Sequence, residues 1–140
     1  MTNKSLALAL LVLAACHHAK SAGVPQCPVE LQPSAIDIHA SAGWKPFVPR
    51  SLPLYAARMA SGPPEALGVL VGESVPGRKR ATAYAWTVPG FSQGMWLQCL
   101  YGDGGEMVLS QRLPEPIGTC VIEYLGPKGA VPPKVVVSCT

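Results

Sequence analysis

Prolines and glycines interrupt this chain so often that they limit the folds open to it. Of its 140 residues, 15 are proline and 14 are glycine, about one residue in five. A proline inside a helix costs about 3 kcal/mol, because it removes a backbone donor and clashes with the preceding turn. Helical bundles and coiled coils are therefore excluded, and short strands joined by turns are expected. The length suits a single domain with one core.

The N-terminus has the layout of an export signal that ends in an anchoring residue. Lys4 precedes an unbroken apolar run over residues 6–15, which is too short to span a bilayer as a permanent helix. The run ends in the letters LAAC, which closely resemble the lipobox of bacterial lipoproteins, where the cysteine is acylated and becomes the first residue. This resemblance implies that Cys16 is lipidated. The alternative is an ordinary signal cleaved near Ala22, which would release a soluble periplasmic protein.

Three segments follow from this reading. Residues 1–15 are a lipoprotein signal peptide, residues 16–26 are a flexible tether without hydrophobic periodicity, and residues 27–140 are a disulfide-bonded β domain. His17 follows the lipobox cysteine where inner-membrane lipoproteins of the enteric type carry aspartate. The resemblance therefore implies an anchor in the outer membrane, with the domain facing the periplasm.

The cysteine count agrees with export. Subtracting Cys16 from five cysteines leaves an even set, Cys27, Cys99, Cys120 and Cys139, which suits two disulfides in an oxidising compartment. The count alone leaves three pairings open. There is no CxxC pair and the spacings are not those of a zinc module, so we expect no metal site.

Alternation with a period of two predicts a mainly β fold: an antiparallel sheet, or a small sandwich or barrel, of about seven short strands stapled by two disulfides. A single helical turn is expected at residues 63–67, because proline suits a first helical position. The strands are predicted at residues 36–40, 54–60, 80–87, 95–101, 107–113, 119–124 and 134–139.

Two predicted hairpins have registers that the apolar pattern selects. In the first, Tyr101 opposite Met107 keeps one face largely apolar, whereas a slip of one residue would mix apolar and charged side chains. In the second, residues 119–124 pair with residues 134–139, and Cys120 falls nearly opposite Cys139. This register favours a Cys120–Cys139 disulfide, which leaves the other two cysteines for each other.

Charge and motifs exclude several classes of function. The formal net charge is +3 with only 11 lysines and arginines, too diffuse for a nucleic-acid footprint. Neither a GxGxxG nor a Walker-type phosphate loop is present, so no nucleotide or other cofactor is expected. Asp103 and Glu106 supply too few oxygens for calcium.

No catalytic constellation is visible in the predicted domain. Its one histidine, His39, lies two residues from Asp37 on the same predicted strand face, and a solvated outer surface explains both residues. The four domain cysteines are used in disulfides, which leaves no thiol nucleophile. We therefore expect a protein that works by binding and is not an enzyme.

Two features are candidates for partner binding. Arg78, Lys79 and Arg80 form the only run of consecutive charges, which suits an acidic partner or anionic headgroups, or else a solvated strand end. Phe91 lies in a loop, where aromatic residues often serve as binding hot spots. We take these four residues as the expected contacts.

Several short motifs point to a family resemblance. They are Cys27-Pro28, Ala42-Gly43-Trp44, Gly62-Pro63-Pro64, the strand WLQCLY at residues 96–101 and the final cysteines. With them, the stretch from Cys27 to Cys139 resembles a family of small exported proteobacterial proteins, some of which are associated with type VI secretion loci. The resemblance carries over no catalytic residue. It implies a periplasmic role, which for some members is immunity against a toxic envelope effector.

These observations lead to one principal hypothesis and one alternative. The principal hypothesis is a lipid-anchored module that binds a periplasmic protein, as an immunity or inhibitor protein against an envelope-acting enzyme. Periplasmic lysozyme-inhibitor lipoproteins are similar in size, anchor and disulfides, but their serine-rich inhibitory loop is absent. The alternative is a structural or assembly lipoprotein of the envelope or of a secretion apparatus.

Overall fold

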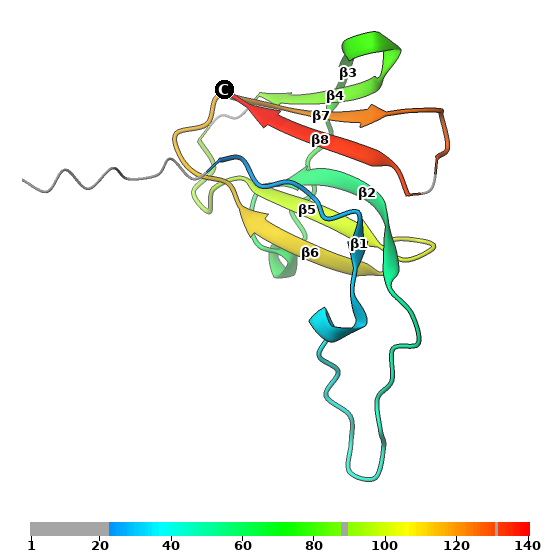
Figure 1. Cartoon of the computed structure of the whole chain (residues 1–140). Helices are drawn as coiled ribbons and strands as arrows, with labels where there is room; N and C mark the ends of the chain where they lie inside the picture. Colours follow the sequence, from blue (N-terminus) through cyan, green and yellow to red (C-terminus); the bar gives the residue numbers. More distant parts are fainter. Residues whose placement is uncertain (1–22, 88–89, 131) are drawn as a thin grey trace, which may run out of the picture.

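A computed structural model of the chain describes residues 23–87, 90–130 and 132–140 (Figure 1). The predicted signal peptide, the lipidation residue Cys16 and the tether up to residue 22 lie outside the described residues. Within those residues the chain forms eight strands in two antiparallel sheets of four, stacked in two layers. The predicted mainly β fold is confirmed. No helix in the described part is long and apolar enough to cross a membrane.

The two sheets have different strand orders. The first sheet has the order β1-β2-β5-β6, with bounds Glu30–Leu31, Leu52–Ala60, Trp96–Tyr101 and Met107–Arg112. The second has the order β3-β4-β7-β8, with bounds Glu73–Pro76, Thr82–Thr87, Thr119–Leu125 and Lys134–Cys139. Three short 3-10 turns, η1, η2 and η3, complete the described part at Pro33–Ala35, Pro64–Ala66 and Arg78–Arg80. The helical turn expected at residues 63–67 is η2.

Both predicted hairpin registers are confirmed. Tyr101 pairs with Met107 across β5 and β6, and Cys120 pairs with Cys139 across β7 and β8. The four described cysteines form the disulfides Cys27–Cys99 and Cys120–Cys139. The first disulfide joins the segment before β1 to the middle of β5 across 72 residues, and the second closes one edge of the other sheet.

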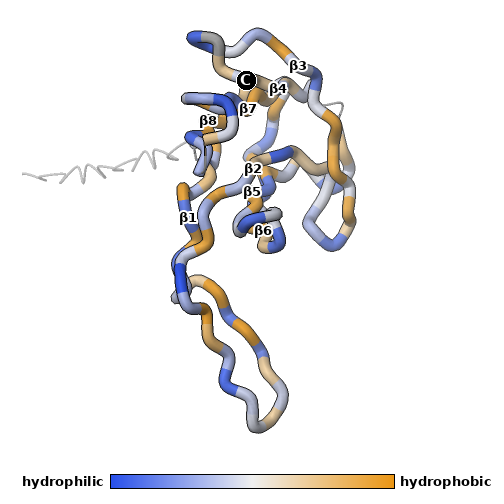
Figure 2. Tube along the Cα trace, turned by 90° about the vertical axis from the view of Figure 1, so that its right-hand side faces the viewer, coloured by the Kyte–Doolittle hydropathy of each residue, from blue (hydrophilic) through white to orange (hydrophobic). Residues whose placement is uncertain are grey.

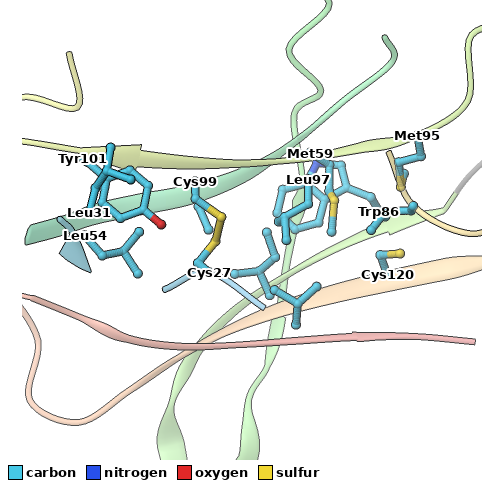
Figure 3. Packing of buried hydrophobic residues seen from close by; sticks show 14 residues of the cluster. Cys27, Leu31, Leu54, Met59, Trp86, Met95, Leu97, Cys99, Tyr101 and Cys120 are labelled. Carbon is cyan, nitrogen blue, oxygen red and sulfur yellow. A yellow bond between two sulfur atoms is a disulfide. The ribbon is translucent and has the colours of Figure 1, made fainter. Parts of the chain in front are cut away.

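One core lies between the sheets (Figure 3). Leu54 and Met59 of β2 and Leu97 of β5 face Trp86 of β4 and Ile122 of β7, and none of these side chains is more than 8% exposed. Burying a side chain of this size is worth about 1.5–3 kcal/mol. On β7 and β8 every second residue packs in this core, as the period-two pattern predicts.

A tyrosine also links the two layers. The hydroxyl of Tyr124 on β7 accepts a hydrogen bond from the Ala57 N–H at 3.0 Å and donates one to the Ala57 carbonyl at 2.8 Å. Ala57 lies on β2, beyond the two residues of that strand that β1 pairs with. Burial raises the pKa of Tyr124, which keeps the hydroxyl protonated and able to donate.

The chain joins the domain beside β8. The Gln26 side chain donates a hydrogen bond to the Val137 carbonyl at 2.7 Å and accepts one from the Val137 N–H at 2.9 Å. Val24 packs against the core. Contacts with the domain thus begin inside the segment predicted as a tether, a few residues before Cys27.

One predicted strand is wrong. Residues 36–40 form no strand, and they belong to a long excursion between β1 and β2 that projects away from both sheets (Figures 1 and 2). The alternation of Ile36 and Ile38 with polar residues has the right period, but no neighbouring strand pairs with this segment. We call residues 36–50 the arm.

Candidate functional site

The arm leaves and rejoins the sandwich at a single point. Leu31 at the end of β1 pairs directly with Leu52 at the start of β2, so the two ends of the excursion lie side by side. At the tip the Trp44 N–H donates to the Ser41 carbonyl at 3.1 Å, which closes a turn. Gly43 within this turn has φ +88°, a conformation that glycine adopts without strain. The arm is thus a two-limbed loop with a defined reversal.

Large apolar side chains on the arm are exposed. Trp44 is 77% exposed and Phe47 is 82% exposed, and Ile38 is also open to solvent. The hydropathy colouring shows hydrophobic stretches on both limbs, which stand clear of the sheets (Figure 2). A hollow of about 330 Å³ lies between the limbs, lined by Pro33, Ile36, Asp37, Ile38, Pro46, Phe47 and Val48.

The predicted cationic run forms the turn η3 between β3 and β4, but it is not three free charges. The Arg78 guanidinium donates to the Glu123 carboxylate, with Nε to Oε2 at 2.6 Å, and the Arg78 N–H donates to Oε1 at 2.8 Å. Glu123 on β7 is only 5% exposed, so Arg78 neutralises a buried charge. These hydrogen bonds hold the pKa of Glu123 below its usual range.

The other members of the predicted contact set are placed differently. Lys79 is exposed at φ +50°, in the left-handed region that a lysine rarely adopts, and Arg80 ends the same turn. Phe91 is half-buried and lines a cavity of about 450 Å³ together with Met95 and Leu113. The loop of Phe91 follows β4 whereas η3 precedes it, so the structure brings the three cationic residues together but not Phe91.

A second hollow gathers tyrosines at the end of the sandwich where η3 lies. Tyr55 of β2, Tyr84 of β4 and Tyr124 of β7 line a groove of about 500 Å³ that the β7–β8 loop, including Lys128, closes on one side. Tyr84 and Tyr124 meet edge to face, with ring centroids 6.4 Å apart. Tyrosine side chains on a concave surface suit protein recognition.

Within the described residues the candidate chemistry is sparse. His39 Nε2 lies 3.6 Å from Asp37 Oδ2, and both side chains are almost fully exposed on the arm. No group of three or more His, Cys, Asp or Glu residues in the described part is arranged to hold a metal ion. A solvated pair on a projecting loop is without the buried, oriented partners that a catalytic histidine uses.

Sequence reasoning missed both the arm and the tyrosine groove. The groove joins residues from three strands that are distant in sequence, so no local sequence pattern predicts it. A sequence feature could have predicted the arm. Trp44 and Phe47 lie in a stretch rich in proline and glycine, which is unsuited to a paired strand. A large aromatic residue in such a stretch is a candidate for an exposed binding anchor.

Comparison with known proteins identifies a family. The family model described as "Type VI secretion system Tli immunity protein" matches residues 49–140, which include every strand except β1. No curated protein and no solved structure matches the chain.

Proposed function

The chain belongs to the type VI secretion system Tli immunity protein family, and from this premise we propose that it protects its host by binding an effector directly, without catalysis. The family match over residues 49–140 carries this proposal. The resemblance to proteins of type VI secretion loci, drawn from the sequence, is confirmed by the same match. An immunity protein of this kind acts as a stoichiometric inhibitor.

The described side chains support binding over catalysis. All four described cysteines are tied up in disulfides, so none of them is a thiolate nucleophile. Both side chains of the Asp37–His39 pair are open to solvent, so the pair is without the enclosed site that a catalytic dyad uses. The exposed apolar arm and the tyrosine groove, in contrast, are features of interaction surfaces.

We further propose that the protein acts in the periplasm as a lipoprotein anchored in the outer membrane through Cys16. The export signal and the lipobox-like LAAC sequence support this location, and two disulfides suit an oxidising compartment. In the host we expect the wild-type chain to incorporate labelled palmitate and to fractionate with membranes. A Cys16→Ala variant that still incorporates the label would contradict the anchor.

The exposed part of the cationic turn remains in the proposed contact surface. Arg78 is committed to Glu123, so a test of charge has to spare it. Lys79→Asp is the suitable change, because aspartate tolerates the left-handed backbone that Lys79 adopts. We expect weaker protection with an unchanged melting temperature. Unchanged protection would remove Lys79 from the contact surface, and Arg80→Asp and Phe91→Ala test the two remaining predicted contacts in the same way.

The function itself is tested by competition between strains. A host strain lacking this gene is grown in contact with its parent, and its survival is compared with that beside a parent whose type VI secretion is inactive. We expect killing by the active parent only, and rescue by a plasmid copy of the gene. Survival without the gene would contradict immunity. Loss of secretion by the deletion strain would instead support the alternative, an assembly lipoprotein.

A further inference from the structure

We infer that the arm is an effector-contacting element, and that Trp44 and Phe47 enter an apolar cleft with an acidic rim on the effector. This inference rests on the proposed function, because immunity supplies the protein partner. It adds what the family match does not give, since that match begins at residue 49 and the arm almost wholly precedes it.

The first argument is the exposure of the two rings. A tryptophan and a phenylalanine that are 77% and 82% exposed leave most of their apolar surface in water, which is unfavourable unless a partner covers it. Aromatic side chains bury about 150–250 Å² each, so the two rings would contribute roughly 300–500 Å² of the approximately 800 Å² that each partner buries in a standard interface. The tip of the arm is therefore large enough to anchor a complex.

The second argument is that the arm is held in shape before binding. Pro46 and Pro49 restrict the backbone on either side of Phe47 and Val48, and the turn at Gly43 is closed by a hydrogen bond. At the base, Arg50 pairs with Asp103 of the β5–β6 loop at 3.7 Å, and the Ser51 hydroxyl donates to Glu30 at 2.9 Å. A loop that is already ordered loses less entropy on association.

Position favours a protein cleft over the host's own membrane, and charge suits an acidic rim on that cleft. Lys45 lies between Trp44 and Phe47 on the arm, and the whole chain has a formal net charge of +3, which suits an acidic rim. Arg50 at the base is already paired with Asp103. The arm is attached beside the β5–β6 loop, whereas the chain joins the domain beside Val137, at the other end of the sandwich (Figure 1). The arm thus projects from the end of the sandwich remote from Gln26, where the described chain enters the domain.

The test is protection by an arm variant. The deletion strain carries the full chain with Trp44→Ala and Phe47→Ala, and is challenged by its parent. Truncating hot-spot side chains weakens binding by about 30-fold or more, so we expect survival to fall toward that of the strain without the gene. Equal cellular levels and equal melting temperatures of the wild-type and variant proteins separate lost contacts from lost folding.

A matched control uses apolar residues that are just as exposed elsewhere. Leu67 and Val71, on the connection between β2 and β3, are 83% and 96% exposed. The Leu67→Ala and Val71→Ala chain should protect as well as the wild type. Full protection by the arm variant, or equal loss in both variants, would overturn the inference. The proposed function would survive either result as long as the wild-type copy protects.

Cross-linking in cells tests which molecule contacts the arm. A photoreactive phenylalanine analogue replaces Phe47, and the adducts formed during contact with the active parent are identified. We expect an adduct with a second polypeptide, and a parent lacking the gene for that polypeptide should no longer kill the unprotected strain. Adducts only with a second copy of this chain, or only with lipid, would overturn the assignment.

Discussion

The sandwich buries its apolar side chains and the arm exposes them, although both belong to one short chain. In the sandwich, apolar residues at every second position find a facing layer, and their side chains are buried between β2, β5, β4 and β7. In the arm a similar alternation finds no partner strand, and its largest side chains are exposed. Alternating apolar residues therefore stabilise the sandwich, where a second layer covers them. In the arm nothing covers the apolar side chains, and they form a surface suited to binding.

Removing a disulfide should give the largest loss of stability in the sandwich. Replacing Cys27 and Cys99 with alanine should lower the free energy of unfolding by about 4 kcal/mol, and the same change at Cys120 and Cys139 by about 3 kcal/mol, because the longer loop restricts the unfolded chain more. Chemical denaturation of each variant measures this difference. The contrast between sandwich and arm would fail if removing Cys27–Cys99 lowered the free energy of unfolding no more than Trp44→Ala with Phe47→Ala does.

The link between the layers should give the next largest effect. Tyr124→Phe removes the hydroxyl that binds both backbone groups of Ala57, and we expect a loss of about 1–3 kcal/mol. Tyr84→Phe is the matched control, since Tyr84 is partly exposed beside the same groove, and its effect should be small. Equal thermal shifts in the two variants would show that the hydrogen bonds of Tyr124 contribute nothing.

Acid should weaken the sandwich through Glu123. Its pKa is lower in the folded chain than in the unfolded chain, so its contribution is complete above the unfolded value and is lost as the pH falls through the folded value. The wild-type protein should therefore lose stability on acidification more steeply than a Glu123→Gln variant. Urea unfolding from neutral to acidic pH measures both, and parallel curves would contradict the role given to Arg78.

The arm should give the smallest effect on stability. The Trp44→Ala and Phe47→Ala chain should unfold within about 0.5 kcal/mol of the wild type, because exposed side chains away from the core add little. Chemical denaturation provides the measurement. A large loss would mean that the two rings pack against the domain in solution, and the distinction between the two regions would then fail.

The sequence predicted those parts of the fold in which local pattern and tertiary contact agree. The Tyr101–Met107 register follows from apolar matching across one hairpin, and the Cys120–Cys139 pair follows from the register of another. Residues 36–40 show where such reasoning ends, because alternation describes a strand only if another strand lies beside it. Here the neighbouring chain is the return limb of the arm, which forms no ladder with it.

The cationic run shows the same limit at the level of the site. Arg78 looks like one of three solvated charges in the sequence, yet it binds a glutamate 45 positions away that is buried beneath it. Glu123 alternates with inward-facing Ile122 and Tyr124, which places it on the outer face of β7. Only the packing of η3 against β7 reveals the ion pair between Arg78 and Glu123. Lys79, which is exposed, remains a charge that we propose to test.

Removing the arm tests the account most directly. Because Leu31 and Leu52 pair directly, residues 32–51 can be replaced by a tight hairpin turn that joins β1 to β2. The sandwich should fold with both disulfides, because the roughly 2 kcal/mol gained from the shorter loop offsets the lost packing of Ile36 against the core. We predict that this armless chain, at wild-type levels in the deletion strain, gives no protection against the active parent. Full protection would contradict the claim that the sandwich is the scaffold and the arm contacts the effector.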